Sequence, residues 1–147
     1  MELIKPIEGK AKGVTFTIWD VGGEEKIRPL WRSYIRHTDA IVFVIDSVDQ
    51  ERFEEAKLEL TNLLRCPDIR STVPIVVLSN KQDLPGSRNE REVTASLGLT
   101  DAHSSHNFQF IECCAVTGEG LENFFDLLYT AILNCQKQQK TKRRNKR

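Results

Sequence analysis

The chain has 147 residues, 39% of them hydrophobic and 29% charged, and its 21 basic residues balance its 21 acidic ones. This composition excludes a disordered polymer and predicts one globular domain. The longest apolar run, Ala40–Ile45, is too short to cross a membrane, and charge and proline close to Met1 predict that no signal peptide is present. Four cysteines without a secretory signal predict intracellular, reduced thiols.

The balanced charge conceals two oppositely charged parts. Residues 137–147 carry seven basic residues and no acidic one, so residues 1–136 hold 14 basic side chains (21 − 7) against 21 acidic ones. We therefore expect an acidic folded domain over residues 1–136 and a disordered basic tail over residues 137–147.

Five segments are predicted to be strands: Leu3–Ile7, Val14–Ile18, Ala40–Ile45, Pro74–Leu78 and Phe108–Ile111. Val14–Ile18 alternates apolar and polar residues, which indicates a half-buried strand, and residues 8–13 before it are predicted to be a hairpin connection. Ala40–Ile45 and Pro74–Leu78 are continuous apolar runs rich in β-branched residues. Such runs are typical of parallel strands that are covered on both faces.

Apolar residues at helical spacing predict helices between and after these strands. The first helix is expected from Phe53, with its end near Cys66 and Pro67, and the second over Glu90–Leu97, where Gly98 ends it. A third apolar stripe runs from Leu121 to Cys135 and stops where the basic tail begins. Strands that alternate with helices predict an α/β fold with a mostly parallel sheet between helical layers.

Polar clusters follow three of the expected strands, and ligands bind at the carboxyl ends of the strands in folds of this kind. The first cluster is Trp19–Glu24. Gly22 and Gly23 let the backbone turn and bring bare amides close to an anion, while Asp20 could hold a cation directly or through water. The alternative for this cluster is an ordinary strand-to-loop turn.

The second cluster is Asn80–Asp83. The carboxylate of Asp83 can accept two adjacent N–H bonds, which the edge of guanine presents and that of adenine does not. Asn80 could tie the loop together, and Lys81 could lie over the face of the base. The alternative is a polar loop in which Asp83 caps a turn.

The third cluster is Cys113–Gly118. Its small residues would allow a backbone N–H to approach a carbonyl group of the same base. The alternative is that the cysteines are buried and behave as small hydrophobic residues.

The order W-D-x-G-G, N-K-x-D and C-A-x resembles the small GTPases of the ADP-ribosylation-factor-like family, and the resemblance extends over the whole chain. Residues 20–34 are similar to the switch II region of that family, and the basic tail and Glu54–Lys57 resemble its subclass-four members. The resemblance implies a small GTPase fold of the P-loop NTPase type. It also implies a GTP/GDP-binding switch protein that acts in membrane traffic or in cytoskeletal or plasma-membrane signalling.

The resemblance also implies roles for single residues. Asp20 would reach the Mg²⁺ ion of the nucleotide through water, and Gly23 would offer its amide to the γ-phosphate. The residues that would bind guanine are Asn80, Lys81, Asp83, Cys114 and Ala115. The residues that would meet exchange factors and effectors are Ile27, Leu30, Trp31 and Tyr34. The alternative for these four is a partly buried helix face.

The chain departs from the family pattern at its front end. Its 147 residues contain no G-x-x-x-x-G-K-[ST] phosphate loop and no switch I threonine. We therefore expect a fold without the first strand, the phosphate loop and the first helix of the family, with impaired nucleotide binding. The absent strand would lie between Val14–Ile18 and Ala40–Ile45, so two inner strand edges are expected to need partners.

Glu24 is a second departure, because the family usually has the water-positioning glutamine there. An ionised glutamate only accepts hydrogen bonds and adds negative charge near a phosphate. Slow intrinsic hydrolysis is therefore expected even with a complete phosphate site.

The tail is expected to bind an acidic membrane surface or an import receptor. Near acidic lipid, each cation should contribute about 1 kcal/mol to the binding free energy. Its cations are Lys140, Lys142, Arg143, Arg144, Lys146 and Arg147, with Lys137 before them. A general polyanion binder or a merely solvated end is the alternative, and no specific nucleic acid is expected. No glycine follows Met1, so a myristoyl group cannot serve as a second anchor, and membrane binding should be weak and salt-sensitive. We expect a cytoplasmic protein with peripheral membrane and nuclear pools.

A different class of function stays open at this point. The chain would then be a non-enzymatic interaction protein that uses the switch II region and the basic tail without a nucleotide cycle.

Overall fold

The structure is a computed structural model that describes residues 4–102 and 106–146. The strands are β1 (Ile4–Ala11), β2 (Val14–Val21), β3 (Ile41–Asp46), β4 (Ile75–Asn80) and β5 (Phe108–Glu112). The helices are α1 (Arg28–Ile35), α2 (Phe53–Leu64), α3 (Glu90–Ser96), α4 (Leu99–Ala102) and α5 (Phe124–Arg144), with a short 3₁₀ turn, η1 (Gln50–Arg52), before α2.

The strands form two separate sheets. β1 and β2 are an antiparallel hairpin that ends on the pair Ala11↔Val14, and β3, β4 and β5 are parallel in the order β3-β4-β5. Lys12 and Gly13 have φ angles of 50° and 78°, which suit a two-residue hairpin turn. The predicted connection over residues 8–13 is therefore too long, because β1 continues to Ala11.

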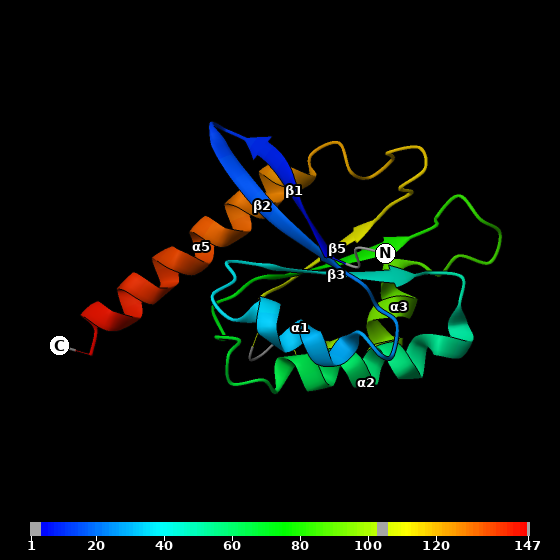
Figure 1. Cartoon of the computed structure of the whole chain (residues 1–147), viewed down its shortest axis with the longest axis horizontal. Helices are drawn as coiled ribbons and strands as arrows, with labels where there is room; N and C mark the ends of the chain where they lie inside the picture. The colour runs from blue at the N-terminus through cyan, green and yellow to red at the C-terminus, as the bar shows by residue number, and fades with distance from the viewer. Residues whose placement is uncertain (1–3, 103–105, 147) are drawn as a thin grey trace.

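Helices cover both faces of the parallel sheet (Figure 1). On one face, Ile75 and Val77 of β4 belong to a core cluster with Leu60 of α2. On the other face, Val76 packs in a second cluster with Leu128 of α5. Consecutive residues of β4 thus point into opposite cores, and this confirms the predicted three-layer α/β fold.

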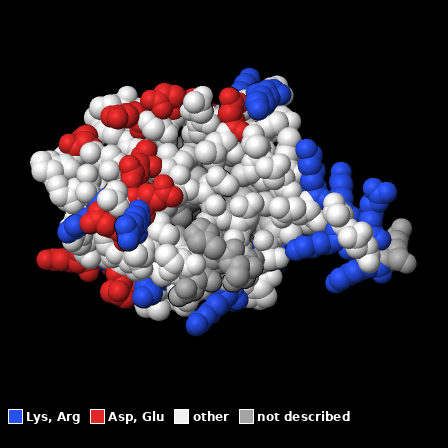
Figure 2. Space-filling model, turned by 180° about the vertical axis from the view of Figure 1, so that it is seen from behind, with Lys and Arg blue, Asp and Glu red and all other residues white. Residues whose placement is uncertain are grey.

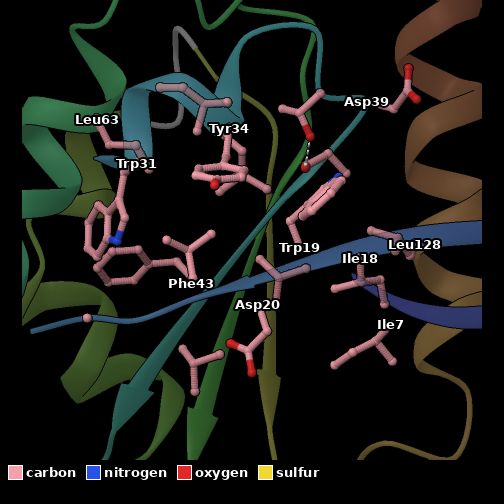
Figure 3. A pocket seen from close by; sticks show the side chains of 18 of the residues that line it. Ile7, Ile18, Trp19, Asp20, Trp31, Tyr34, Asp39, Phe43, Leu63 and Leu128 are labelled. Atoms are coloured by element: carbon pink, nitrogen blue, oxygen red, sulfur yellow. Dashed lines mark hydrogen bonds between the residues drawn. The ribbon is translucent and has the colours of Figure 1, made fainter. Parts of the chain in front are cut away.

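The predicted pair of inner strand edges is also confirmed. Among the described residues β2 pairs only with β1, and β3 only with β4. A cavity of about 1170 Å³ lies between β2 and β3, and side chains of α1, α2 and α5 complete its walls (Figure 3). The core of the parallel sheet is therefore complete around β4 and incomplete beside β3.

The predicted helix over Glu90–Leu97 is observed as α3. Its N-terminus carries a capping box, in which the side chain of Asn89 accepts from the amide of Glu92 and the side chain of Glu92 accepts from the amide of Asn89. Gly98 has a φ of 68°, the left-handed conformation that commonly ends a helix.

The last helix differs from the sequence prediction at its C-terminal end. α5 does not stop at Cys135 but continues to Arg144, so most of residues 137–147 are helical and not disordered. Lysine, arginine and glutamine are good helix formers, and cations in the last turn interact favourably with the helix dipole. The side chain of Gln139 also donates to the hydroxyl oxygen of Thr72.

α5 therefore projects from the body as a basic arm (Figure 1). In Figure 2, Lys and Arg side chains gather on this arm, while Asp and Glu side chains are distributed over the body. Arg147 lies outside the described residues. No helix in the described part of the chain combines the length and the apolar character that a membrane span requires.

Candidate functional site

The second and third clusters of the sequence are brought together at the carboxyl ends of β4 and β5. The side-chain oxygen of Asn80 accepts a hydrogen bond from the backbone N–H of Ala115 at 2.9 Å. The backbone N–H of Gln82 donates to the carbonyl oxygen of Cys113 at 3.1 Å. Asn80 thus ties the two loops to each other, as its position after a buried strand suggested.

The loop after β5 is also held by its own backbone. The N–H of Gly118 donates to the carbonyl oxygen of Cys114 at 2.8 Å, and the N–H of Cys114 donates to that of Glu119 at 3.0 Å. Cys114 is 1% exposed, whereas Ala115 is exposed. The side chain of Cys114 is therefore part of the core, and it is the backbone at Ala115 that lies at the surface of the site.

Asp83 follows at the exposed end of the Asn80 loop. Its carboxylate makes no hydrogen bond or ion pair with the residues that the structure describes, although its charge helps to raise the pKa of the neighbouring Lys81. A paired carboxylate would have to release its partner before it accepted two N–H groups of a base. Asp83 is free to do so at once.

Lys81 has a partner that sequence reasoning missed. Its ammonium group lies 2.6 Å from the carboxylate of Asp46 at the end of β3, and its backbone has a φ of 68°. Although burial raises the pKa of Asp46, the hydrogen bonds from Lys81 and from the amide of Val48 outweigh it and lower that pKa. The same contact raises the pKa of Lys81. The sequence feature that could have indicated this partner is Asp46, the acidic residue directly after the apolar run Ala40–Ile45.

The first cluster is fixed to α1 and α2 rather than to the other two loops. The indole N–H of Trp31 donates to the carbonyl oxygen of Gly22 at 2.8 Å, and Nε of Arg28 donates to that of Gly23, also at 2.8 Å. Arg28 also contacts Glu55 at 2.5 Å and Glu59 at 3.0 Å on α2. Its guanidinium thus connects the turn after β2 to the neighbouring helix.

Asp20, Gly23 and Glu24 line the cavity between the two sheets, and so does Asp46. Both carboxylates of the first cluster, Asp20 and Glu24, are exposed. The structure therefore joins the second and third clusters directly and connects the first to them only across this cavity.

The residues expected to meet partners divide into an inner and an outer pair. Ile27 is buried, with 7% of its surface exposed, and Trp31 packs against the first core with its ring edge-on to Phe43 at 6.4 Å between centroids. The side chains of Ile27 and Trp31 therefore pack α1 against the body of the protein and are not available to a partner. This agrees with the buried-helix alternative for these two residues.

Of the outer pair, Leu30 faces the surface, whereas Tyr34 is half-buried and lines the cavity beside β2. Leu30 is 45% exposed. The ring of Tyr34 lies 5.7 Å from that of Trp19 on β2, and Trp19 is itself 52% exposed. Trp19 thus contributes a further exposed apolar side chain beside Tyr34, although the sequence analysis did not include it among the partner-binding residues.

The donors present fit a guanine base better than a metal ion. In the described part of the chain the carboxylate of Asp83 has no hydrogen-bond partner, and Asn80 is fixed because its side-chain oxygen accepts from the backbone N–H of Ala115. For Mg²⁺, Asp20 is a single exposed carboxylate, and the described residues contain no group of three or more His, Cys, Asp or Glu side chains that could hold an ion. Asp20 alone fits a contact through water, with the other ligands supplied by nucleotide and solvent.

Acid should weaken the attachment between α1 and α2. Hydrogen bonds from Arg52 and Arg28 lower the pKa of Glu55 from 4.5 to about 2. A lowered pKa contributes stability that is fully present above about pH 4.5 and is lost as the pH falls towards 2. Urea unfolding as a function of pH should show this loss in the wild type, and Glu55→Gln should reduce the slope. Equal slopes for the two proteins would contradict the assignment.

A parallel sheet between helical layers, with N-K-x-D tied to C-A-x at its carboxyl edge, defines the fold of a small GTPase. The family model "ADP-ribosylation factor family" matches residues 5–132. The chain therefore belongs to the ADP-ribosylation factor family, as its three motifs indicated.

Curated relatives agree with this assignment. The chain is 46% identical over 145 residues to human ADP-ribosylation factor-like protein 4A, a match that covers 97% of the chain and 72% of the relative. It is 44% identical over 143 residues to human ADP-ribosylation factor-like protein 4C, covering 97% and 74%. These matches confirm the resemblance to the subclass-four proteins.

A solved structure supports the fold. The small GTPase Arl6 (BBS3) of Trypanosoma brucei, with the bound nucleotide analogue GppNp, superposes with a TM-score of 0.84 at 29% identity. The match covers 91% of this chain and 81% of that one.

Proposed function

We propose that the chain is a guanine-nucleotide-binding switch protein whose base-reading half is intact. The observation that carries this proposal is the hydrogen bond from Ala115 to Asn80 beside the free carboxylate of Asp83. It places an acceptor for two N–H groups next to an exposed backbone segment on the neighbouring loop. Membership of the family supports regulation by exchange factors and effectors, in membrane traffic or in cytoskeletal or plasma-membrane signalling.

For these 147 residues we propose weak nucleotide binding and no useful hydrolysis. The sequence holds no phosphate loop, and Asp20 is the single carboxylate assigned to the Mg²⁺ ion. Glu24, at the glutamine position of the family, is exposed and cannot donate to developing charge when it is ionised. Binding of the phosphate groups should therefore be weakened more than recognition of the guanine base.

Separate titrations with GDP and with ADP test this proposal. Titration of the ¹⁵N-labelled chain with each nucleotide should shift the amide signals of residues 80–83 and 113–118 with GDP at concentrations where ADP leaves them unchanged. The selectivity arises because only guanine presents two adjacent N–H groups to Asp83. Equal shifts with ADP, or tight Mg²⁺-dependent binding of GTP, would contradict it.

The basic arm supports a second part of the proposal, reversible binding to an acidic surface. Five of its cations are exposed on the last part of α5, where the helix keeps them in a fixed arrangement: Lys137, Lys140, Lys142, Arg143 and Arg144. We propose acidic lipid or an import receptor as the partner, with peripheral membrane and nuclear pools of the protein. Binding to vesicles that contain phosphatidylserine should fall steeply with added salt.

One observation favours a rival function without a nucleotide cycle. Trp19 and Tyr34 line the cavity beside β2, and Leu30 is exposed on α1, so these apolar side chains could bind a partner in any nucleotide state. Partner capture in nucleotide-free buffer, compared between the wild type and Leu30→Ala, distinguishes the two. Recovery that depends wholly on added GTP would reject the rival.

A further inference from the structure

The carboxylate of Asp83 has no hydrogen bond of its own, among the described residues, that could orient it, and the residue is exposed. A carboxylate accepts two N–H groups of a base only when both of its oxygens point at them within a narrow range of angles. The orientation of Asp83 must therefore come from the residues beside it. Leu84 after it is exposed, whereas Gln82 before it is half-buried, so Gln82 is the neighbour that can fix Asp83 from inside.

The side chain of Gln82 turns inward and makes hydrogen bonds there. Its Nε2 donates to the carbonyl oxygen of Arg88 at 3.0 Å. The same nitrogen also donates to the carbonyl oxygen of Ser79 at 3.5 Å and lies 3.3 Å from the hydroxyl oxygen of that residue. A carbonyl oxygen only accepts, so both contacts depend on the two N–H groups of the glutamine amide. A side chain of the same length without N–H groups could not make them.

Both residues that accept from this amide are themselves held in place. Ser79 is a fully buried residue of β4. The backbone N–H of Arg88 donates to the carbonyl oxygen of Ser47 at 3.0 Å, directly after β3. The guanidinium of Arg88 donates to the carboxylate of Glu92 on α3 at 2.8 Å and to the side-chain oxygen of Gln50 at 2.7 Å. The amide is therefore attached to fixed points on β4 and directly before α3.

The hydrogen bond to Arg88 closes the loop of residues 82–88, and Asp83 is the first residue inside that loop. The main chain of Gln82 is fixed as well, because its N–H donates to the carbonyl oxygen of Cys113 on the neighbouring loop at 3.1 Å. Backbone and side chain of one residue thus hold the start of the loop from two directions. The position of Asp83 follows from both.

The backbone on the other side of Gln82 is strained. Lys81 has a φ of 68°, a left-handed conformation that residues other than glycine rarely adopt. Such a conformation persists only where the surrounding structure holds the chain in it. The bonds of Gln82 supply this restraint directly after the strained residue and directly before Asp83.

We infer that Gln82 is a positioning residue for guanine recognition: its inward-facing amide holds the carboxylate of Asp83 at the place where the base binds. This role rests on the proposed function, in which Asp83 accepts two adjacent N–H groups of guanine. Gln82 acts through Asp83 and makes no contact with the base. Loss of its amide should therefore reduce the selectivity for the guanine base and not simply the affinity for a nucleotide.

Separate titrations with GDP and with inosine diphosphate measure this selectivity. The base of inosine lacks the amino group of guanine, so it presents one N–H to Asp83 where guanine presents two. The amide signals of residues 80–83 and 113–118 of the ¹⁵N-labelled chain report the binding. The wild type should bind GDP at least about tenfold more tightly, which corresponds to one hydrogen bond to a charged group. Equal binding by the wild type would overturn the proposed function, and the role of Gln82 with it.

Gln82→Met and Gln138→Met form a matched pair of variants, because Gln138 is an exposed glutamine on α5. Methionine keeps the length of the side chain and removes both donors. In Gln82→Met the preference for GDP over inosine diphosphate should fall at least about threefold, since a misdirected carboxylate makes weaker hydrogen bonds. Gln138→Met should keep the preference. A Gln82→Met chain with the wild-type preference would overturn the role of Gln82 alone, because a merely structural effect weakens both nucleotides equally.

Hydrogen exchange of side-chain amides tests the same role in the wild type, without a variant that has to fold. The NH₂ group of Gln82 should exchange with water at least about tenfold more slowly than that of Gln138, because its hydrogens are bonded to Arg88 and Ser79. Equal exchange rates for the two glutamines would show that the amide of Gln82 is not held, and would overturn its positioning role.

Discussion

Supplying a phosphate loop should raise nucleotide affinity by on the order of a thousandfold or more. A segment with the pattern G-x-x-x-x-G-K-[ST], fused before Met1, would offer several charge-assisted hydrogen bonds to phosphate, each worth about 1.5–3 kcal/mol. Three such bonds already amount to three or more powers of ten in Kd. The measurement is equilibrium titration of the fused protein and of the 147-residue chain with fluorescent GDP.

A fused segment in which the lysine and the glycines of the loop are replaced by alanine is the matched control. It extends the chain by the same length but presents neither the cation nor the close backbone approach. Its affinity should remain that of the unmodified chain. If the control gains as much as the intact loop, the added affinity comes from stabilising the fold and not from contact with phosphate.

Leu60→Ala should lower the free energy of unfolding by about 2–5 kcal/mol, the usual cost of removing a buried leucine side chain. Leu60 is 1% exposed and lies in the cluster that joins α2 to β3 and β4. A loss of this size is a large part of the stability of an ordinary domain. Chemical denaturation of the wild type and the variant measures it.

Leu58→Ala is the control on the same helix. Leu58 is 59% exposed, so its truncation should change the free energy of unfolding by no more than about 0.5 kcal/mol. Similar losses for the two variants would show that α2 does not pack against the sheet with the face described here.

The sequence predicted the parallel sheet well because its strands are covered on both faces. The runs Ala40–Ile45 and Pro74–Leu78 correspond closely to β3 and β4, and Val76 and Val77 of β4 are both fully buried. Periodicity alone does not distinguish a short apolar run from a buried helix segment, but the length and the β-branched residues of these two runs favour strands. The helix that begins at Phe53 was predicted for a similar reason, because its apolar residues recur at one spacing, although it ends at Leu64 and not near Cys66 as expected.

The ends of α5 were harder to predict. Apolar periodicity marks only the part of a helix that packs against a core, and in α5 this part includes Leu128 and ends at the buried Cys135. Beyond it the helix is stabilised by propensity and by the charges of its last turn, which leave no apolar pattern. The strand β1 was cut short in the same way, since residues 8–11 are held by pairing with β2 and contain no buried apolar side chain larger than that of the half-buried Ala11.

The candidate site was only partly accessible from the sequence. Asn80 and Asp83 could be assigned because a polar loop directly follows a buried strand. The contact of Lys81 with Asp46 joins residues of different strands, and no local pattern encodes which two strand ends meet. The hydrogen bond of Arg28 with Gly23 depends likewise on where α1 lies.

Asp83→Asn in the fused protein tests directly whether the carboxylate of Asp83 recognises guanine. An asparagine offers one acceptor and one donor, which suit xanthine, whose ring has a carbonyl where guanine has an amino group. Losing one bidentate pair costs about 1–3 kcal/mol, or roughly 5- to 150-fold in Kd. If Asp83 binds guanine in this way, the variant should lose GDP affinity by this factor and gain affinity for xanthosine diphosphate, measured by equilibrium titration. Unchanged preference for GDP in the variant would contradict it.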